Sequence, residues 1–276
     1  TCDANQPIIL VPVDFSDYSE RACNMAFRLA AIHNASIVLL YSYVDPVYSN
    51  RVQLSDMLTF DSKNSDSDER AFVEEEAQRQ MKNFTDRILD RIKAGSIPAV
   101  KFSTEIIEGI PEESIVQYAK EHLPILIVMG TRGAGTKERE LVGSVTAEVL
   151  DTCRFPVFTV PDTVSISSVS DITDIVFFSN FDQEDILAID ALFRILPVEH
   201  LNMVLVKIPG KKQSSDSDSD SLSRLGAYCR EHYPAHHFAI DTLSISSIED
   251  DFSRITRDMP VKLIAVPNKK KNIFAR

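Results

Sequence analysis

The 276-residue sequence has little that would suit a membrane or a nucleic acid. No apolar run approaches the roughly 20 residues that a helix needs to cross a bilayer, so the sequence predicts no membrane segment. The formal net charge of −12 argues against a nucleic-acid partner, because a phosphate backbone requires a basic surface. A single nucleotide is still compatible with this balance, since it needs only a local positive field.

Paired cysteines and a recognisable secretory signal are also not seen in this sequence. Cys2, Cys23, Cys153 and Cys229 are scattered, with no CxxC pair and no metal-ligand spacing. Such usage is typical of a reducing compartment rather than of a disulfide-stapled domain. The first seven residues show neither a basic nor an apolar segment, so no secretory signal is visible. These features predict a cytoplasmic protein.

What the sequence does contain is an alternation of strand-like and helix-like segments. Apolar runs that indicate strands lie at 8–13, 37–43, 100–107, 125–129 and 155–160. Helical spacing of apolar residues appears between them, at 16–31, 69–93, 111–122 and from 144 onward. Alternating β and α elements predict an α/β fold with an open parallel sheet and helices on both faces.

The second half repeats the beginning of the first. Residues 175–180 align with 9–14, which places Asn180 opposite Asp14 at a separation of 166 residues. Val204 follows Val38 at the same separation. A shared separation across a helix-length gap indicates an internal repeat.

The repeat is incomplete in sequence. Residues 262–266 resemble the fourth strand again, but 267–272 carry Pro-Asn-Lys-Lys-Lys-Asn where the first half has a glycine-rich loop. We therefore expect a first domain at 1–162 and a degenerate, C-terminally incomplete copy at 171–276 that does not bind a nucleotide in the same manner. Between its strands, the Ser-Asp tract at 213–221 is typical of a disordered loop.

The most distinctive motif is Gly130-Thr-Arg-Gly133, followed after nine residues by Gly143-Ser144. It follows a buried apolar strand and precedes a helical pattern. Glycines let a backbone approach an anion closely, and a helix N-terminus offers free N–H groups and the positive end of a dipole. The spacing is neither that of a Walker loop nor GxGxxG. The alternative is a turn whose glycines only permit the bend, with Ser144 as a helix cap.

Gly-x2-Gly-x9-Gly-Ser after a strand resembles the nucleotide motif of the universal stress protein family, in its ATP-binding branch. The segments 8–16, 37–43 and 155–160 resemble that family's first, second and last strands in the same order. The resemblance covers about residues 6–161. It implies a five-stranded sheet of order 3-2-1-4-5 and an adenine nucleotide, ATP or AMP or ADP, with Mg²⁺ or Mn²⁺ on its phosphates.

The resemblance also implies site residues. Asp14 stands at a strand end, where it either bonds adenine or ribose or begins a turn that caps the next helix. Arg132 either pairs with a phosphate or extends into solvent. Ser42 differs from the apolar residue that is usual in the family. The residues expected near the base and sugar are Pro12, Val13, Asp14, Ser42 and Met129, and those near the phosphates are Gly130, Arg132, Gly133, Gly143, Ser144, Val145 and Thr146.

The sequence thus predicts a stress-response module that binds an adenine nucleotide and senses its occupancy. No catalytic residues and no protein-held metal are predicted, because the motif supplies glycines and hydroxyls but no base. Two alternatives stay open: a slow ATPase or nucleotidyl transferase, and a structural dimerisation module independent of nucleotide. The expected partners are the nucleotide, the second domain packed on the first, and a second copy paired through 155–160.

Overall fold

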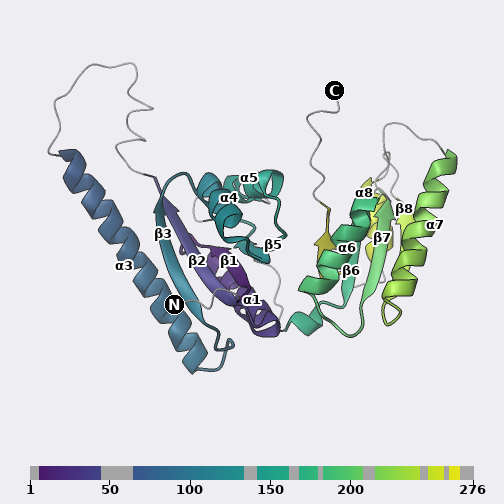
Figure 1. Ribbon diagram of the computed structural model, residues 1–276, viewed down its shortest axis with the longest axis horizontal. Helices are drawn as coiled ribbons and strands as arrows, with labels where there is room; N and C mark the ends of the chain where they lie inside the picture. Colours follow the sequence, from purple (N-terminus) through teal and green to yellow (C-terminus); the bar gives the residue numbers. More distant parts are fainter. Residues whose placement is uncertain are drawn as a thin grey trace, which may run out of the picture. The chain divides into compact units, whose positions relative to one another are not determined.

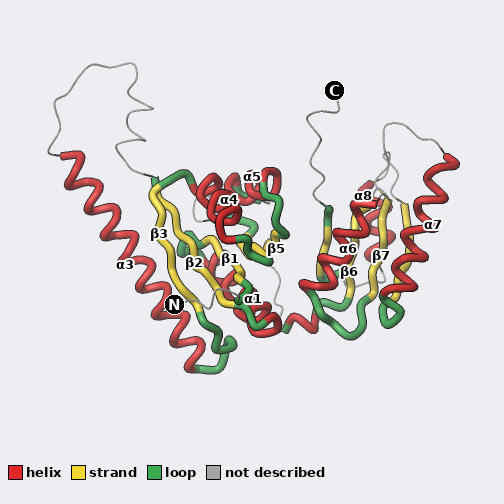
Figure 2. Tube along the Cα trace, viewed as in Figure 1, coloured by secondary structure: helices red, strands yellow, loops and turns green. Residues whose placement is uncertain are grey.

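The computed structural model describes residues 6–44, 65–133, 142–161, 168–179, 183–207, 215–242, 248–257 and 261–267. The chain divides into two compact units, Thr1–Val164 and Ser165–Arg276. This division falls in the Ser-rich stretch between the expected domains, 1–162 and 171–276, whose own bounds stay a prediction. Each unit contains its own parallel sheet (Figure 1, Figure 2).

Strands and helices alternate along the first unit (Figure 1). Its elements are β1 (Ile8–Pro12), α1 (Asp17–His33), β2 (Ser36–Tyr43), α3 (Ser65–Lys93), β3 (Phe102–Glu108), α4 (Pro111–His122), β4 (Leu126–Gly130), α5 (Ser144–Thr152) and β5 (Val157–Val160). The five strands are parallel, in the order β3-β2-β1-β4-β5. The predicted fold class is therefore confirmed, and α3 begins four residues before the expected position 69.

The core of the first unit follows the two-residue period of its strands. Leu10, Val38 and Ile127 are buried in one cluster with residues of α4 and α5. Alternation turns the intervening residues, such as Ile9 and Ile37, to the opposite face, where α1 and α3 lie (Figure 1). Each face of the sheet is thus closed by two helices.

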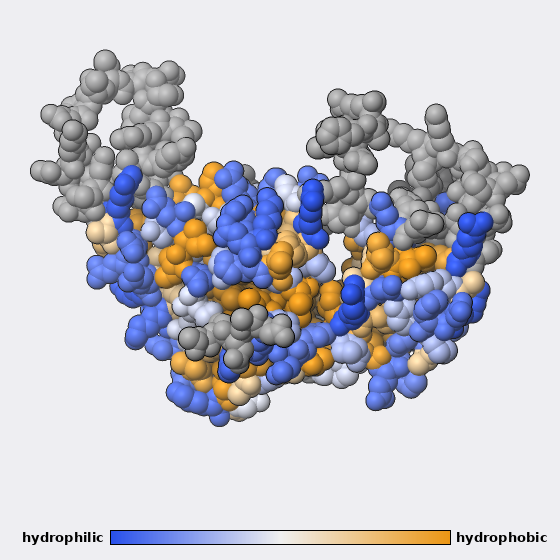
Figure 3. Space-filling model, viewed as in Figure 1, coloured by the Kyte–Doolittle hydropathy of each residue, from blue (hydrophilic) through white to orange (hydrophobic). Residues whose placement is uncertain are grey.

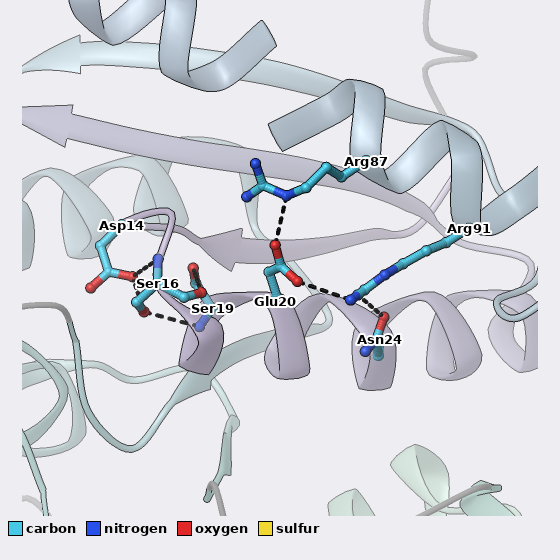
Figure 4. Close-up of polar contacts among 7 residues, drawn as sticks. All are labelled: Asp14, Ser16, Ser19, Glu20, Asn24, Arg87 and Arg91. Carbon is cyan, nitrogen blue, oxygen red and sulfur yellow. Dashed lines mark hydrogen bonds and ion pairs between the residues drawn. The ribbon is translucent and has the colours of Figure 1, made fainter. Parts of the chain in front are cut away.

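The helix α3 is amphipathic and is tied to α1. Ala77, Met81, Phe84 and Ile88 recur at helical spacing and are buried, whereas its outward surface is mostly hydrophilic (Figure 3). Glu20 of α1 accepts from Arg87 Nε at 2.7 Å and from Arg91 Nη2 at 2.9 Å (Figure 4). These partly exposed ion pairs add little stability each, so apolar packing is the main link between the two helices.

The second unit repeats the first four strands. Its elements are the 3₁₀ turn η1 (Val169–Asp171), β6 (Asp174–Ser179), α6 (Gln183–Ile195), β7 (Asn202–Lys207), α7 (Ser215–His232), β8 (His237–Thr242), α8 (Ile248–Thr256) and β9 (Leu263–Ala265). The sheet order is β8-β7-β6-β9. Val176 pairs with Val204 as Leu10 pairs with Val38, which agrees with the sequence repeat. The strand expected at 262–266 is β9, beside β6.

One sequence-based expectation in the second unit is wrong. The helix α7 begins at Ser215, so the tract at 213–221 is not a disordered loop over 215–221, and its first two residues lie outside the described part.

Within the described ranges, no helix is both long enough and apolar enough to cross a bilayer.

Packing on the sheet of the first unit can be tested at Phe27. This residue is fully buried on α1, and its ring meets Phe102 edge-on at 5.7 Å. We expect Phe27→Ala to lower the free energy of unfolding of this unit by about 3–5 kcal/mol, because it leaves a cavity. Phe72→Ala is the control, since Phe72 is 68% exposed on α3. Urea unfolding followed by circular dichroism measures both, and equal losses would contradict the assigned core.

Candidate functional site

Two strand ends meet at the carboxyl edge of the first sheet. β1 and β4 are parallel neighbours, and the strand order reverses between them, since the chain goes from β1 outward to β2 and later returns to β4. Open α/β sheets bind ligands at such a point. Asp14 follows β1 and Gly133 follows β4, and a Cβ added to Gly133 would stand 2.5 Å from Asp14 Oδ2. The fold therefore brings these two predicted site residues together.

Asp14 begins a short turn that leads into α1 (Figure 4). Its Oδ1 accepts from the backbone N–H of Ser16 at 3.1 Å and from the Ser16 hydroxyl. Ser16 in turn caps α1, because its Oγ accepts from the N–H of Ser19 at 3.3 Å. Asp14 thus makes the turn, Ser16 makes the cap, and Oδ2 is the carboxylate oxygen that lies against Gly133.

The middle residue of this turn was not found by sequence reasoning. Phe15 has φ of 63°, in the left-handed region, which costs a non-glycine residue roughly 1–2 kcal/mol. Its ring packs against Tyr41 at 4.5 Å and Phe84 at 5.7 Å between centroids. Burial raises the pKa of Tyr41, and the carboxylates of Asp14 and Glu76 raise it further. Aromatic packing therefore holds a strained backbone directly beside Asp14.

The two ends of the glycine motif are joined by hydrogen bonds. Thr131 N–H donates to Val160 O at 3.2 Å, and Gly143 N–H donates to Thr131 O at 2.8 Å. The Thr146 hydroxyl donates to Gly130 O at 2.9 Å. Gly130 must be small, because a Cβ there would stand 2.8 Å from Tyr18 Cβ on α1. The spacer residues 134–141, with Lys137 and Arg139, lie outside the described part.

The N-terminus of α5 differs from those of α1 and α4. Gly143 is its N-cap and has no side chain to accept from the first N–H groups, whereas Ser16 does so for α1. The first turn of α5 contains no acidic residue. By contrast, α1 has Asp17 and Glu20 there, and α4 also begins with two glutamates. The positive end of α5 is thus left without compensating charge in its own first turn, which suits an anion.

The remaining phosphate-side residues differ in what they offer. Thr146 is 4% exposed and its hydroxyl already bonds Gly130, so its backbone N–H is the group that can serve a ligand. Ser144 is exposed and Val145 half-buried on the same turn. Arg132 is half-buried and forms no ion pair with any residue of the described ranges. A guanidinium can donate two parallel hydrogen bonds to a phosphate, as the sequence analysis considered for Arg132.

Three of the base-side residues, Pro12, Ser42 and Met129, lie on the α4/α5 face at the same edge. Leu10, Leu40 and Met129 belong to the core on that face, and the strand period places Pro12 and Ser42 there too. Pro12 and Ser42 are half-buried, whereas Met129 is 4% and Val13 is 6% exposed. Pro12 and Ser42 are therefore the residues of this group that a base could contact.

Among the described residues, no group of three or more His, Cys, Asp or Glu could hold a metal ion.

The family model of the universal stress protein family matches residues 7–161, just over half of the chain. This chain belongs to the universal stress protein family. "Universal stress protein MJ0531" of Methanocaldococcus jannaschii is 30% identical over 152 residues, which cover 55% of this chain and 80% of that protein.

Both units of this universal stress protein have a structural counterpart. A universal stress protein from Archaeoglobus fulgidus shares the fold over 94% of this chain and 86% of its own, with a TM-score of 0.59 at 17% identity. A universal stress protein from the same organism was solved in complex with dAMP; it is 19% identical, with a TM-score of 0.32 over 56% of this chain and 96% of its own. The dAMP was observed in the Archaeoglobus fulgidus protein.

The frame of the motif can be tested by removing one hydroxyl. Thr146→Val keeps the shape of the side chain but leaves the buried carbonyl of Gly130 without its donor, so we expect a loss of about 1–3 kcal/mol in the free energy of unfolding. Thr152→Val is the matched control on the same helix, because its hydroxyl bonds the exposed Glu148 carbonyl. Chemical unfolding compares the two, and equal stability would contradict a structural role for the Thr146 hydroxyl.

Proposed function

We propose that the first unit binds an adenine nucleotide, ATP or else AMP or ADP, at the carboxyl edge between β1 and β4. The observation that carries this proposal is the N-terminus of α5, which has a glycine cap and no acid in its first turn. Free N–H groups at a helix N-terminus need an acceptor, and a phosphate chain is an acceptor of matching charge.

The phosphates would lie against the backbone N–H groups of Ser144, Val145 and Thr146. The hydrogen bonds from Gly143 to Thr131 and from Thr146 to Gly130 hold this turn at the end of β4. The N–H groups therefore keep their direction before a ligand arrives. Arg132 adds a positive charge near the same loop. Mg²⁺ or Mn²⁺ would sit on the phosphate oxygens and reduce their charge.

The sugar and base would extend toward Asp14, Pro12 and Ser42. Two like charges 4 Å apart repel by about 4 kcal/mol at an effective dielectric constant of 20, so the Asp14 carboxylate must face the sugar rather than the phosphates. A carboxylate is a good acceptor for ribose hydroxyls. Pro12 and Ser42 offer a half-buried surface for the base at the same edge.

In the proposed role, occupancy of this site is the signal. Nucleotide binding stabilises the motif loop by mass action and so biases the contacts of the first unit, with the second unit or a second copy as the expected partners. The second unit has Pro-Asn-Lys-Lys-Lys-Asn after the position of β9 instead of the glycine motif. We therefore assign nucleotide binding to the first unit alone.

A single charge at the start of α5 tests this function. Ser144 is exposed, so Ser144→Glu should leave the free protein as stable or raise its stability by about 0.3–1 kcal/mol through the helix dipole. The same charge would repel phosphates. We expect ATP–Mg²⁺ at about 100 times its dissociation constant to stabilise the wild type by about 2.7 kcal/mol, and Ser144→Glu to lose most of that shift at the same concentration.

Ser144→Gln is the matched control, because it has the same size without the charge and should keep most of the shift. Differential scanning fluorimetry at several ATP concentrations measures all three proteins. If millimolar ATP–Mg²⁺ leaves the wild-type melting temperature unchanged, the structural dimerisation module is the better account. Mass spectrometry of the ligand released from freshly purified protein would identify the nucleotide.

A further inference from the structure

The turn from Asp14 to Ser16 carries more order than a helix cap requires. Ser16 alone satisfies the start of α1 through its hydroxyl, as an N-cap does in most helices. The same hydroxyl also donates to Asp14 Oδ1, a bond that N-capping does not require (Figure 4). The backbone N–H of Ser16 bonds the same oxygen. Two donors therefore fix one carboxylate oxygen, which sets the direction of the other.

A strained residue lies between these two. Phe15 adopts the left-handed region at φ of 63°, although a ring-bearing residue disfavours it. Strain of this kind persists only where the surroundings enforce it, and it gathers at functional sites. Here Tyr41 of β2 and Phe84 of α3 enforce it by packing on the Phe15 ring. Phe84 is 1% exposed, so this anchor belongs to the rigid core.

We propose that Phe15 and Ser16 are positioning residues that aim Asp14 Oδ2 at the ribose hydroxyls of the bound nucleotide. Phe15 fixes the backbone of the turn, and Ser16 holds Oδ1. Oδ2 then points to the motif side, where it lies against Gly133. This inference rests on the proposed nucleotide binding and adds a specificity to it: the aimed carboxylate distinguishes a ribose from a sugar without its hydroxyls.

The test is the ratio of two dissociation constants, that of 2′,3′-dideoxy-ATP over that of ATP, each with Mg²⁺, measured by isothermal titration calorimetry on the full chain. Hydrogen bonds to a charged group predict a ratio of roughly 10 to 100 for the wild type. Asp14→Ala should bring the ratio close to one. A residue that only supports the fold would weaken both ligands equally and leave the ratio unchanged.

Ser16→Gly removes the hydroxyl but keeps a residue that is nearly as good an N-cap. Phe15→Gly removes the ring at a residue type that adopts positive φ freely. Both should lower the ratio several-fold toward that of Asp14→Ala, and Ser16→Thr, which restores a hydroxyl, should recover it. Asn34→Gly is the matched control, because Asn34 has φ of 49° at the other end of α1 and should keep the wild-type ratio.

The outcomes distinguish nucleotide binding itself from the positioning role of Phe15 and Ser16. No binding of ATP by the wild type would overturn the proposed function itself. A wild type that binds ATP without preference over the dideoxy compound, or an Asp14→Ala variant that keeps the preference, would overturn the role of Oδ2. A preference that is unchanged in both Ser16→Gly and Phe15→Gly would overturn the positioning role while nucleotide binding stands.

Discussion

The site depends on the N–H groups at the start of α5, which have no side-chain acceptor within their own turn. Every α-helix begins with N–H groups that lack an intrahelical acceptor. At the same edge of the sheet, α1 satisfies this need with Ser16 and adds Asp17 and Glu20 in its first turn. In α5, Gly143 supplies no side chain and the first turn no acid. An anionic ligand would supply the missing acceptor for these N–H groups, and the other site residues surround this position.

The rest of the first unit keeps this position rigid and places a carboxylate across from it. Parallel pairing of β1 with β4 brings the turn at Asp14 to the glycine loop, although the two are far apart in sequence. The loop ends are joined through Thr131, Gly143 and Thr146, and α3 holds the turn through Phe84. The positive helix end and the acid are therefore held by separate contacts. Such an arrangement orients a molecule that is anionic at one end and hydroxylated at the other.

The alternation of strands and helices could be predicted because the strands are short, apolar and separated by helices with clear periodicity, whereas the strand order 3-2-1-4-5 came from the family resemblance. The strand β9 was also predicted from the sequence. In the structure, Leu263 pairs with β6 as Leu126 pairs with β1. Three features of the site could not be predicted from the sequence. The strain at Phe15 depends on rings from β2 and α3, the contact of Gly130 with Tyr18 depends on packing, and the bond of the Thr146 hydroxyl depends on loop closure. Each arises from distant parts of the chain, which no local pattern encodes. The start of α7 was missed for a different reason, because composition alone favoured a loop.

Nuclear magnetic resonance of the backbone amides in a titration with ATP–Mg²⁺ shows whether the start of α5 holds the phosphates. We expect the N–H signals of Ser144, Val145 and Thr146 to move downfield and their hydrogen exchange to slow, because each gains a charged acceptor. Signals at the far end of α5, around Thr152, should hardly move. If ATP binds while the three amides keep the chemical shifts and exchange rates of the free protein, the phosphates do not bind at the start of α5.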